Sequence, residues 1–387
     1  MRIAFDAQLI FEKQKTGIGW TSEHILKNII KEFNNEYYLN YYTFHKAREK
    51  KKIVEEYIDL GYKLKKCVYL PNYLYKRAWN VIPIPYSRLF GNKAQITQFF
   101  NYDVPPGVNG KAVTFIYDMV YRAFPETIDQ KNKKMLDYNL SVACKRADHI
   151  ITISEFSKNE IIKYMQVEEN KVSIMPCGVD TSIYHVNYTE TEVQTVKRKY
   201  GITGDYLLYL GTLEPRKNIE RLIKAYALLI ERLHDAPLLV LAGKKGWMYD
   251  KILSLVEFYN LQEKIIFTGY IEAAEAPKLL KGSLLFVFPS IYEGFGIPPL
   301  EAMACGTPVV VSNQASMPEV IGDAGYYIDP YQVEDICDAL QTLLGNDNLR
   351  KELSKKGISR AKEFTWSSAV NKLMKIYNKL VWDEGKS

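Results

Sequence analysis

Short runs of apolar and β-branched residues alternate with helical patterns along most of the chain. Nine runs have the length of a strand, and they cover residues 2–5, 41–44, 112–116, 149–153, 206–210, 238–242, 264–267, 284–288 and 308–311. Several are apolar throughout, as expected for parallel strands that are covered on both faces. This alternation predicts parallel, doubly wound α/β sheets.

Helical periodicity is clearest from Asn218 to about residue 234, where apolar residues recur at spacings of three and four. Asn218 is a favourable N-cap, and Glu220 lies in the first turn, where the helix dipole favours a carboxylate. Residues 366–382 carry another apolar stripe, which predicts a helix at the end of the chain.

Two sets of strands in 387 residues predict two Rossmann-like domains. Ligands of open α/β sheets bind outside the carboxyl ends of the strands, so we expect the two domains to face each other across a cleft. A polar stretch at residues 179–204 interrupts the strand pattern. We therefore expect an N-terminal domain over residues 1–190, a C-terminal domain over 191–365, and a helix over 366–387 that packs back on the first domain.

The composition is that of an ordinary globular protein, with 47% hydrophobic and 25% charged residues. No apolar run approaches the roughly 18 residues of a membrane-spanning helix, and the N-terminus lacks a signal-peptide pattern. The five cysteines are scattered without a C-x-x-C pair, and the five histidines are dispersed. We therefore expect a cytoplasmic protein without a disulfide framework or a bound metal.

The net charge of +6 is unevenly distributed. Between Lys46 and Phe90 lie eleven basic and four acidic residues, interleaved with Tyr57, Tyr62, Tyr69, Tyr73, Tyr75, Trp79 and Tyr86. One interpretation is a solvated, lysine-rich surface on a helical stretch. The other is a surface that contacts anionic lipid head groups or a phosphorylated lipid acceptor. We expect no nucleic-acid partner, because no recognised binding motif accompanies the charge.

Three loops that follow predicted strands carry residues suited to binding an anion. The first, residues 16–19, contains Gly17 and Gly19 and precedes a helical pattern, where backbone N–H groups would face a ligand. Its pattern, G-x-G-x-x-S, lacks the third glycine of the dinucleotide-binding fingerprint. A tight turn without a ligand is an equal alternative.

The second loop, residues 211–218, places Arg216 and Lys217 between the end of a strand and the start of a helix. Both the strand end and the helix dipole favour a bound phosphate or diphosphate there. The alternative is a pair of ordinary surface cations.

The third loop, residues 290–308, has the most specific pattern. Gly294 and Gly296 leave backbone N–H groups available to a ligand, Glu293 lies in the loop, and we expect Glu301 in the first turn of the following helix. Either carboxylate could accept hydrogen bonds from hydroxyl groups. Favourable placement near a helix N-terminus would explain Glu301 alone, but not two glutamates with glycines between them.

Four motifs of the chain resemble those of the retaining glycosyltransferases of family 4, which have the GT-B fold. They are the E-x7-E pattern from Glu293 to Glu301, the sequence GTLEPRKN at residues 211–218, the sequence PCGVD at 176–180, and the serine pair Ser154 and Ser157. The resemblance runs through nearly the whole chain and is strongest over residues 211–325.

This resemblance implies transfer of a hexose, mannose or glucose, from a nucleoside diphosphate sugar to an acceptor hydroxyl, with retention at the anomeric carbon. It places a saccharide or polyprenyl-linked acceptor on the side of the N-terminal domain and the donor on the side of the C-terminal domain. It also implies a role in surface polysaccharide or glycolipid synthesis at the inner face of the plasma membrane, which residues 46–90 would contact.

The resemblance assigns roles to several residues of this chain. Glu301 would bind the ribose hydroxyls, Glu293 the hydroxyls of the donor sugar, and Lys217 the diphosphate, with backbone N–H groups from residues 294–296. Gly17 and Gly19 would lie near the diphosphate or the acceptor. The expected donor-binding residues are Gly17, Gly19, Gly211, Thr212, Arg216, Lys217, Tyr270, Gly294, Phe295, Gly296, Leu300 and Glu301.

The chain departs from the family pattern at three places. Thr212 stands where many members have an arginine, and Arg216 is expected to supply the second cation instead. Tyr117 and Asp118 stand where many members have His-Asp, so Tyr117 would contribute its backbone carbonyl or its hydroxyl at the reaction centre. Cys177 replaces the usual asparagine.

Charge indicates how the transfer would proceed. Negative charge grows on the leaving diphosphate, and cations and N–H groups aimed at it lower the barrier. With Arg216 and Lys217 in place we expect no cofactor or metal, and no D-x-D motif is evident. A covalent intermediate and front-face attack are both compatible with retention. A GT-B epimerase and a non-catalytic nucleotide-sugar binding protein remain as alternatives.

Overall fold

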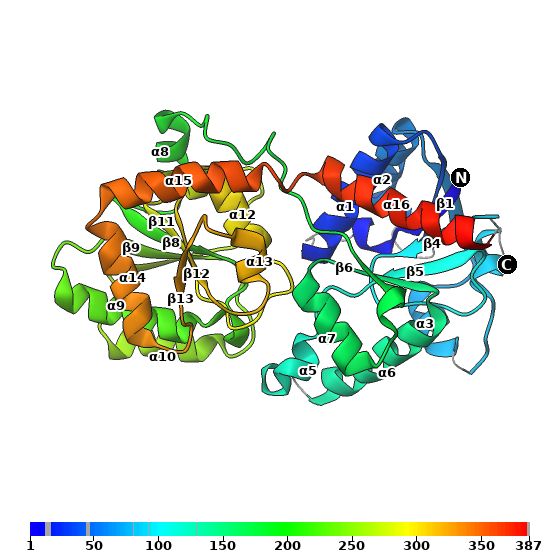
Figure 1. Cartoon of the computed structure of the whole chain (residues 1–387), viewed down its shortest axis with the longest axis horizontal. Coiled ribbons are helices and arrows are strands. Elements are labelled where there is room, and N and C mark those ends of the chain that lie inside the picture. The colour runs from blue at the N-terminus through cyan, green and yellow to red at the C-terminus, as the bar shows by residue number, and fades with distance from the viewer. Residues whose placement is uncertain (12–16, 44–46, 80, 92, 129, 385–387) are drawn as a thin grey trace. The chain divides into compact units, whose positions relative to one another are not determined.

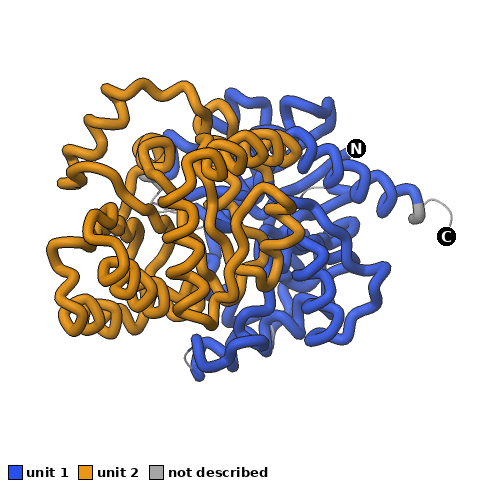
Figure 2. Tube along the Cα trace, turned by 60° about the vertical axis from the view of Figure 1, so that its left-hand side comes forward, with its two compact units in different colours: residues 1–177, 366–387 blue, residues 178–365 orange. Residues whose placement is uncertain are grey.

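The computed structural model describes residues 1–11, 17–43, 47–79, 81–91, 93–128 and 130–384. The chain forms two compact units (Figure 2). Unit 1 comprises Met1–Cys177 and Trp366–Ser387, and unit 2 comprises Gly178–Thr365. Each unit is built on one parallel sheet with helices on both faces (Figure 1). The predicted class, an α/β protein with two Rossmann-like halves, is confirmed.

The structure describes seven strands in the sheet of unit 1, in the order β3-β2-β1-β4-β5-β6-β7. All of them pair in parallel, with Ile3 opposite Tyr37 on one side and Ile96 on the other. Their bounds are β1 (Arg2–Asp6), β2 (Glu36–Tyr42), β3 (Lys63–Cys67), β4 (Ile96–Phe99), β5 (Lys111–Phe115), β6 (His149–Thr152) and β7 (Val172–Ile174).

Helices cover both faces of this sheet (Figure 1). On one face α1 (Gly17–Glu32) packs against α16 (Trp366–Glu384), and on the other α6 (Gln130–Arg146) packs against α7 (Glu155–Met165). The other helical segments are shorter or lie at the margins. They are η1 (Gln8–Phe11), α2 (Ala47–Asp59), α3 (Asn72–Ala78), α4 (Tyr86–Phe90), α5 (Val120–Ala123), η2 (Pro125–Thr127) and η3 (Glu169–Lys171).

The sheet of unit 2 contains six strands in the order β10-β9-β8-β11-β12-β13, again all parallel. Its four central strands are mostly apolar and almost wholly buried, because helices cover both faces, whereas the edge strands β10 and β13 are partly exposed. Their bounds are β8 (Tyr206–Leu210), β9 (Leu238–Ala242), β10 (Ile265–Gly269), β11 (Leu285–Phe288), β12 (Val309–Ser312) and β13 (Tyr326–Ile328).

One helical layer of unit 2 is formed by α9 (Ile219–Arg232), α10 (Tyr249–Phe258) and α14 (Val333–Leu344). The other contains α8 (Glu190–Lys199), α11 (Ala276–Gly282), α12 (Ile297–Ala304) and α15 (Asp347–Ala361). Two short segments, η4 (Pro215–Lys217) and α13 (Met317–Ile321), belong to loops at the strand ends.

Strand prediction was more accurate in unit 2 than in unit 1. All five strands expected there are confirmed to within two residues, and only the three-residue β13 was missed. In unit 1 the predictions missed β3, β4 and β7 and began β2 five residues late. The sequence of β3, KLKKC, contains three lysines because it is an edge strand that is exposed to water.

Asn218 occupies the N-cap position of α9, as predicted, but its side chain does not cap the helix. Asn218 precedes α9, but it adopts a left-handed conformation with φ of 63°, and its side chain caps no helical N–H group. Its amide nitrogen instead donates to the carbonyl oxygens of Pro289 and Pro330, at 3.1 and 2.6 Å. The side chain therefore joins three loops of unit 2.

The two units divide the chain differently from the sequence-based domains. Residues 178–190, which the prediction placed in the first domain, belong to unit 2, where the backbone of Val179 bonds to that of Phe364 at 2.9 Å. Helix α16 belongs to unit 1, and Trp366 at its start stacks on His24 of α1, with ring centroids 4.8 Å apart.

Most aromatic residues between positions 46 and 90 lie in the core of unit 1. Tyr57, Tyr62, Tyr75, Trp79 and Tyr86 are all buried, and only Tyr69 and Tyr73 are exposed. The single helical stretch that the sequence suggested is instead three helices and the strand β3. The interleaved aromatic pattern therefore reflects packing more than surface chemistry.

A hydrogen bond between Tyr377 of α16 and Gln98 of β4 attaches the C-terminal helix to the sheet of unit 1. Its contribution to stability can be measured by mutation. The buried tyrosine hydroxyl donates to the buried Gln98 Oε1 at 2.6 Å. We expect Tyr377→Phe to lower the free energy of unfolding by about 1–3 kcal/mol, because it leaves a buried acceptor unsatisfied. Urea denaturation measures the loss. The exposed Tyr73 provides the control, since Tyr73→Phe should change stability by less than about 0.5 kcal/mol, and equal effects would contradict the expectation.

Candidate active site

The order of strands in unit 2 points to one place for a ligand. Strand β8 pairs with β9 on one side and with β11 on the other, so the chain reverses its direction of progress across the sheet between β8 and β11. In open α/β sheets, ligands bind at such a switch point, outside the carboxyl ends of the strands. The loops that leave β8 and β11 there are residues 211–217 and 289–296.

These two loops meet through three charged side chains. The Lys217 ammonium donates to Oε1 of Glu293, and the Arg216 guanidinium lies 3.2 Å from Oε2 of the same carboxylate. Arg216 also donates from Nε to Glu214 Oε1 at 2.6 Å and from Nη1 to the Tyr292 carbonyl at 3.2 Å. The backbone joins the loops as well, since Ile291 N–H donates to the Arg216 carbonyl at 2.9 Å.

Burial and charge together set the protonation of this cluster. Lys217 and Glu293 are each only 8% exposed. Burial alone would raise the pKa of Glu293, but Lys217 and Arg216 together outweigh it, so the pKa of this carboxyl is lowered. Burial and the neighbouring Arg216 lower the pKa of Lys217, against the opposing effect of Glu293. The sequence predicted these three residues as site residues, and the structure brings them together.

Glu301 lies in a different environment from Glu293. It is the fifth residue of α12, so the prediction that it lies in the first helical turn is wrong. Within the described part of the chain, no cation lies within 4 Å of its carboxylate to form an ion pair. Burial raises its pKa to about 7, and a hydrogen bond with Tyr184 opposes that rise only in part. A carboxylate without a counter-charge is suited to accept hydrogen bonds from a ligand.

Glycines allow the backbone of this region to pack closely. Gly296 precedes α12 with φ of 104°, and a Cβ there would lie 2.2 Å from Cε of Met317. Gly243, after β9, has φ of 142°, and a Cβ there would lie 1.9 Å from the Gly211 carbonyl oxygen. One close approach therefore brings together the loops after β8 and β9, and the other brings together the segments after β11 and β12.

Two residues that the sequence did not reveal hold these loops in place. The fully buried Ser316 hydroxyl donates to the carbonyls of Glu293 and Phe295, at 3.0 and 2.9 Å. Glu214 binds Arg216, although only its neighbours in the motif were singled out. Nothing in the sequence distinguishes Ser316 from other serines, because its partners lie more than twenty residues away.

The remaining residues predicted in unit 2 differ in what they expose. Thr212 is exposed after β8, and Tyr270 is 40% exposed after β10, with the Lys244 ammonium 5.0 Å from its ring centroid. The side chains of Phe295 and Leu300 are buried in the core. These two residues can therefore offer a ligand only their backbone groups.

The predicted residues of unit 1 lie in and beside α1 and β5. Gly17 begins α1, where a Cβ would have no neighbour within 4 Å, Gly19 is buried, and Thr16 lies outside the described residues. The Tyr117 hydroxyl is buried, and burial raises its pKa well above its usual range. Asp118 accepts from the N–H of Val120 at 3.1 Å. Their roles in the reaction stay predictions.

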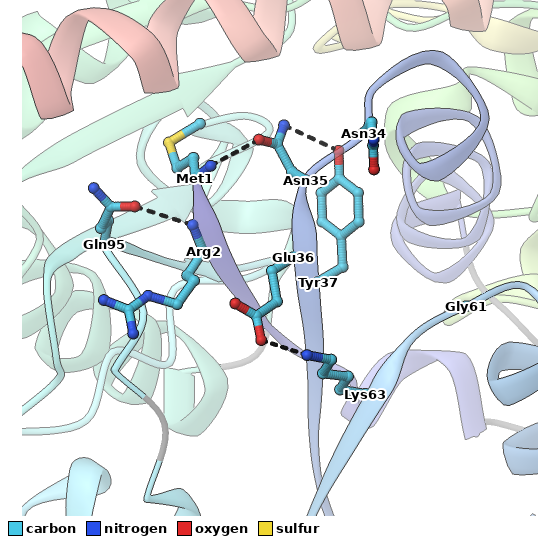
Figure 3. Close-up of a pocket in the computed structure, with 9 residues that line it drawn as sticks. All are labelled: Met1, Arg2, Asn34, Asn35, Glu36, Tyr37, Gly61, Lys63 and Gln95. Carbon is cyan, nitrogen blue, oxygen red and sulfur yellow. Dashed lines mark hydrogen bonds and ion pairs between the residues drawn. The ribbon is translucent and has the colours of Figure 1, made fainter.

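A pocket in unit 1 lies at the amino ends of the strands of its sheet, whereas a ligand is expected at their carboxyl ends (Figure 3). It has a volume of about 710 Å³ and is lined by Met1, Arg2, Asn34, Asn35, Glu36, Tyr37, Gly61, Lys63 and Gln95. Its hydrogen bonds include the pair between Lys63 and Glu36 at 2.5 Å. Because these residues precede or begin β1, β2, β3 and β4, the pocket lies at the amino ends of the strands and away from the carboxyl edge.

Two further properties bear on the class of site. Among the residues that the structure describes, no three His, Cys, Asp or Glu side chains form a group that could hold a metal ion. In the same residues, no helix combines the length and the apolar character needed to cross a bilayer.

The sequence matches two models of protein families. Residues 193–360 match glycosyl transferases group 1, and residues 108–183 match glycosyltransferase family 4. The chain is 35% identical over 273 residues to O-antigen chain mannosyltransferase B of Escherichia coli, a match that covers 70% of this chain and 71% of that protein. The chain therefore belongs to glycosyltransferase family 4, as predicted, and it is a hexosyltransferase.

Other relatives share a part of the chain or the fold. Serotype-specific mannosyltransferase WbdA of Escherichia coli is 35% identical over 239 residues, which cover 61% of this chain but only 29% of that longer protein. The structure of Anabaena Alr3699/HepE in complex with UDP-glucose superposes with a TM-score of 0.74 and 16% identity, covering 98% of this chain and 100% of that one. The shared fold is GT-B.

The two glutamates should affect stability in opposite ways. The folded-state pKa of Glu301, about 7, exceeds its ordinary value of 4.5, so its contribution to stability is full below about pH 4.5 and is lost as the pH rises through 7. We expect Glu301→Gln to raise the free energy of unfolding at pH 8 by up to about 3 kcal/mol, and by less at pH 5. Urea denaturation at the two pH values measures this.

Glu293→Gln is the matched comparison. Because the pKa of Glu293 is lowered in the folded state, its ionised carboxylate stabilises the fold at pH values above its ordinary pKa of 4.5. This stabilisation is lost as the pH falls through the lowered pKa. This variant should therefore be less stable than the wild type at pH 8, since it leaves Lys217 and Arg216 without their counter-charge. If both variants changed stability in the same direction at pH 8, the electrostatic contrast between the glutamates would be wrong.

Proposed function

We propose that this hexosyltransferase moves mannose or glucose from a nucleoside diphosphate sugar to a hydroxyl of a saccharide or polyprenyl-linked acceptor, in the synthesis of a surface polysaccharide or glycolipid. Membership of family 4 supports the reaction, and similarity to O-antigen chain mannosyltransferase B supports mannose and a polysaccharide product. Anabaena Alr3699/HepE, a protein of the same fold, has been solved with UDP-glucose.

One observation carries this proposal. Two cations, Arg216 and Lys217, converge on a single carboxylate at the carboxyl ends of the neighbouring strands β8 and β11, at the edge of the sheet where α/β proteins bind ligands. A diphosphate is the ligand whose charge matches two adjacent cations at such a place. We assign the diphosphate to Lys217 and Arg216 and the ribose hydroxyls to Glu301.

The mechanism follows from where charge develops. When the glycosidic bond to the diphosphate breaks, negative charge grows on the leaving oxygen. Lys217 and Arg216, together with the backbone N–H groups of residues 294–296, would stabilise that charge in a site with little water. We propose that these residues provide the stabilisation without a cofactor or a metal ion, and that the anomeric configuration is retained.

The reported relatives favour transfer over the two alternatives. The named relatives are mannosyltransferases, so an epimerase has no support among them. A non-catalytic protein that binds a nucleotide sugar would give donor binding with no sugar transfer. A transfer assay on the wild type distinguishes these possibilities directly.

Removing the Lys217 ammonium should reduce transfer strongly. We expect Lys217→Met to lower kcat by about a hundredfold or more, because the loss of one donor to a developing anion costs about 3 kcal/mol. The measurement is release of UDP or GDP from the corresponding glucose and mannose donors. We expect EDTA to leave the wild-type rate unchanged. Lys224→Met, on the adjacent helix α9, is the control, and equal losses would contradict the assignment.

We also propose that unit 1 contacts the inner face of the plasma membrane through α3 and its neighbouring loops. Tyr73, Leu74 and Arg77 lie on one exposed face of α3, at helical spacings of three and four. Val81 and Ile82, which follow the helix, are 82% and 60% exposed. Apolar side chains beside basic ones favour a surface of anionic lipid.

Charge reversal tests the membrane contact. The strand that precedes α3, β3, adds the exposed Lys66 to the basic residues of this region. We expect the double variant Lys66→Glu, Arg77→Glu to lose most of its binding to vesicles that contain anionic lipid, because each basic residue near such a surface contributes about 1 kcal/mol. The lysine next to Arg77, Lys76, is left intact because it pairs with Asp103 inside unit 1. Lys351→Glu, Lys355→Glu in α15 changes the net charge equally, so equal loss of vesicle binding would contradict the contact.

A further inference from the structure

Glu293 holds the position that an anionic ligand would take against the two cations. Its two carboxylate oxygens are divided between them, Oε1 on Lys217 and Oε2 on Arg216. With Glu214 also bound to Arg216, the cluster has two positive and two negative charges and a net charge of zero. The charges of the buried Lys217 and the partly buried Arg216 are therefore neutralised before any donor arrives.

A diphosphate must compete with this carboxylate. Lys217 and Glu293 are each only 8% exposed, so water cannot solvate either charge when the pair separates. A buried charge that loses its partner is strongly unfavourable unless a new partner takes its place. The hydroxyl groups of a donor sugar are such partners for Glu293, because a carboxylate accepts hydrogen bonds from hydroxyl donors.

We propose that Glu293 is a specificity-determining residue that occupies the anion site of the free enzyme and makes it bind a nucleoside diphosphate sugar in preference to the free nucleoside diphosphate. The inference rests on the proposed function and adds a role for Glu293 besides contact with the sugar. A sugar-bearing donor replaces the partners of Glu293, whereas a free nucleoside diphosphate displaces the carboxylate and offers it no hydroxyl. Glu293 thereby weakens binding of the product that remains after transfer.

The Ser316 hydroxyl and the adjoining backbone explain why Glu293 stays at this place. The Ser316 hydroxyl donates to the backbone carbonyls of Glu293 and Phe295, so the loop backbone that carries the Glu293 carboxylate is fixed. The Arg216 guanidinium is fixed in turn by Glu214 at 2.6 Å and by the Tyr292 carbonyl at 3.2 Å. The carboxylate and the cations are thus held against each other by groups outside the ion pair itself.

The test compares dissociation constants for GDP and GDP-mannose, and for UDP and UDP-glucose, by isothermal titration calorimetry. For the pair that the wild type binds, we expect Glu293→Gln to bind the free diphosphate at least tenfold more tightly. Binding of the sugar conjugate should change by less than threefold, because the glutamine amide can still bond to hydroxyls. The preference for the sugar conjugate should therefore shrink at least threefold.

Glu214→Gln is the matched control, since it removes the same charge from the same guanidinium without touching Lys217. We expect it to tighten binding of the free diphosphate by less than threefold. If Glu214→Gln and Glu293→Gln tightened it equally, the effect would be one of net charge alone and the proposal would be overturned. An unchanged preference in Glu293→Gln would overturn it as well.

Two further results distinguish failure of this proposal from misfolding of the variant and from failure of the proposed function. Circular dichroism establishes whether Glu293→Gln is folded, and Glu293→Asp, which keeps the charge but withdraws it by one methylene, serves if it is not. The aspartate variant should show the same shift in preference to a smaller degree, and no shift would overturn the proposal. If the wild type bound none of the four ligands, the proposed function itself would fail.

Discussion

A buried lysine and a partly buried arginine at the carboxyl edge of a sheet need a counter-charge, and in unit 2 Glu293 supplies it to both Lys217 and Arg216. The geometry of the surrounding loops depends on this requirement. Gly243 and Gly211 allow the ends of β9 and β8 to approach each other. The side chains of Ser316 and Asn218 donate hydrogen bonds to backbone carbonyls of the loop after β11 and so connect it to other loops. The charged cluster at this edge of the sheet is thereby held in place by the protein itself.

The two glutamates of the E-x7-E pattern show how the environment separates identical side chains. Glu293 is paired with two cations, which lower its pKa, whereas burial without a counter-charge raises the pKa of Glu301 to about 7. One carboxylate is therefore neutralised within the protein, and the other can accept hydrogen bonds from a ligand. Such a pair of environments is typical of a functional site, where stability is sacrificed at particular residues.

Unit 1 shows that a surface inferred from composition can be a core. The tyrosines and tryptophan between positions 46 and 90 suggested an interacting surface, but five of the seven are buried inside the unit, three of them in one cluster with residues of β2, β3 and β4. A tyrosine has an apolar ring and one polar atom, so it can be buried wherever a carbonyl accepts its hydroxyl. Tyr75 does so by donating to the Ile84 carbonyl at 2.9 Å.

The amino-acid sequence by itself determined the fold class and most strands of unit 2, because apolar runs are local patterns. It also singled out Arg216, Lys217 and Glu293 as candidate site residues, because they lie in contiguous motifs. It did not reveal β3, whose lysines lie at a sheet edge, or the positioning residues Glu214 and Ser316. Only the tertiary structure decided which of the two carboxylates is paired with the cations. That choice depends on contacts between segments more than seventy residues apart, which no local pattern encodes.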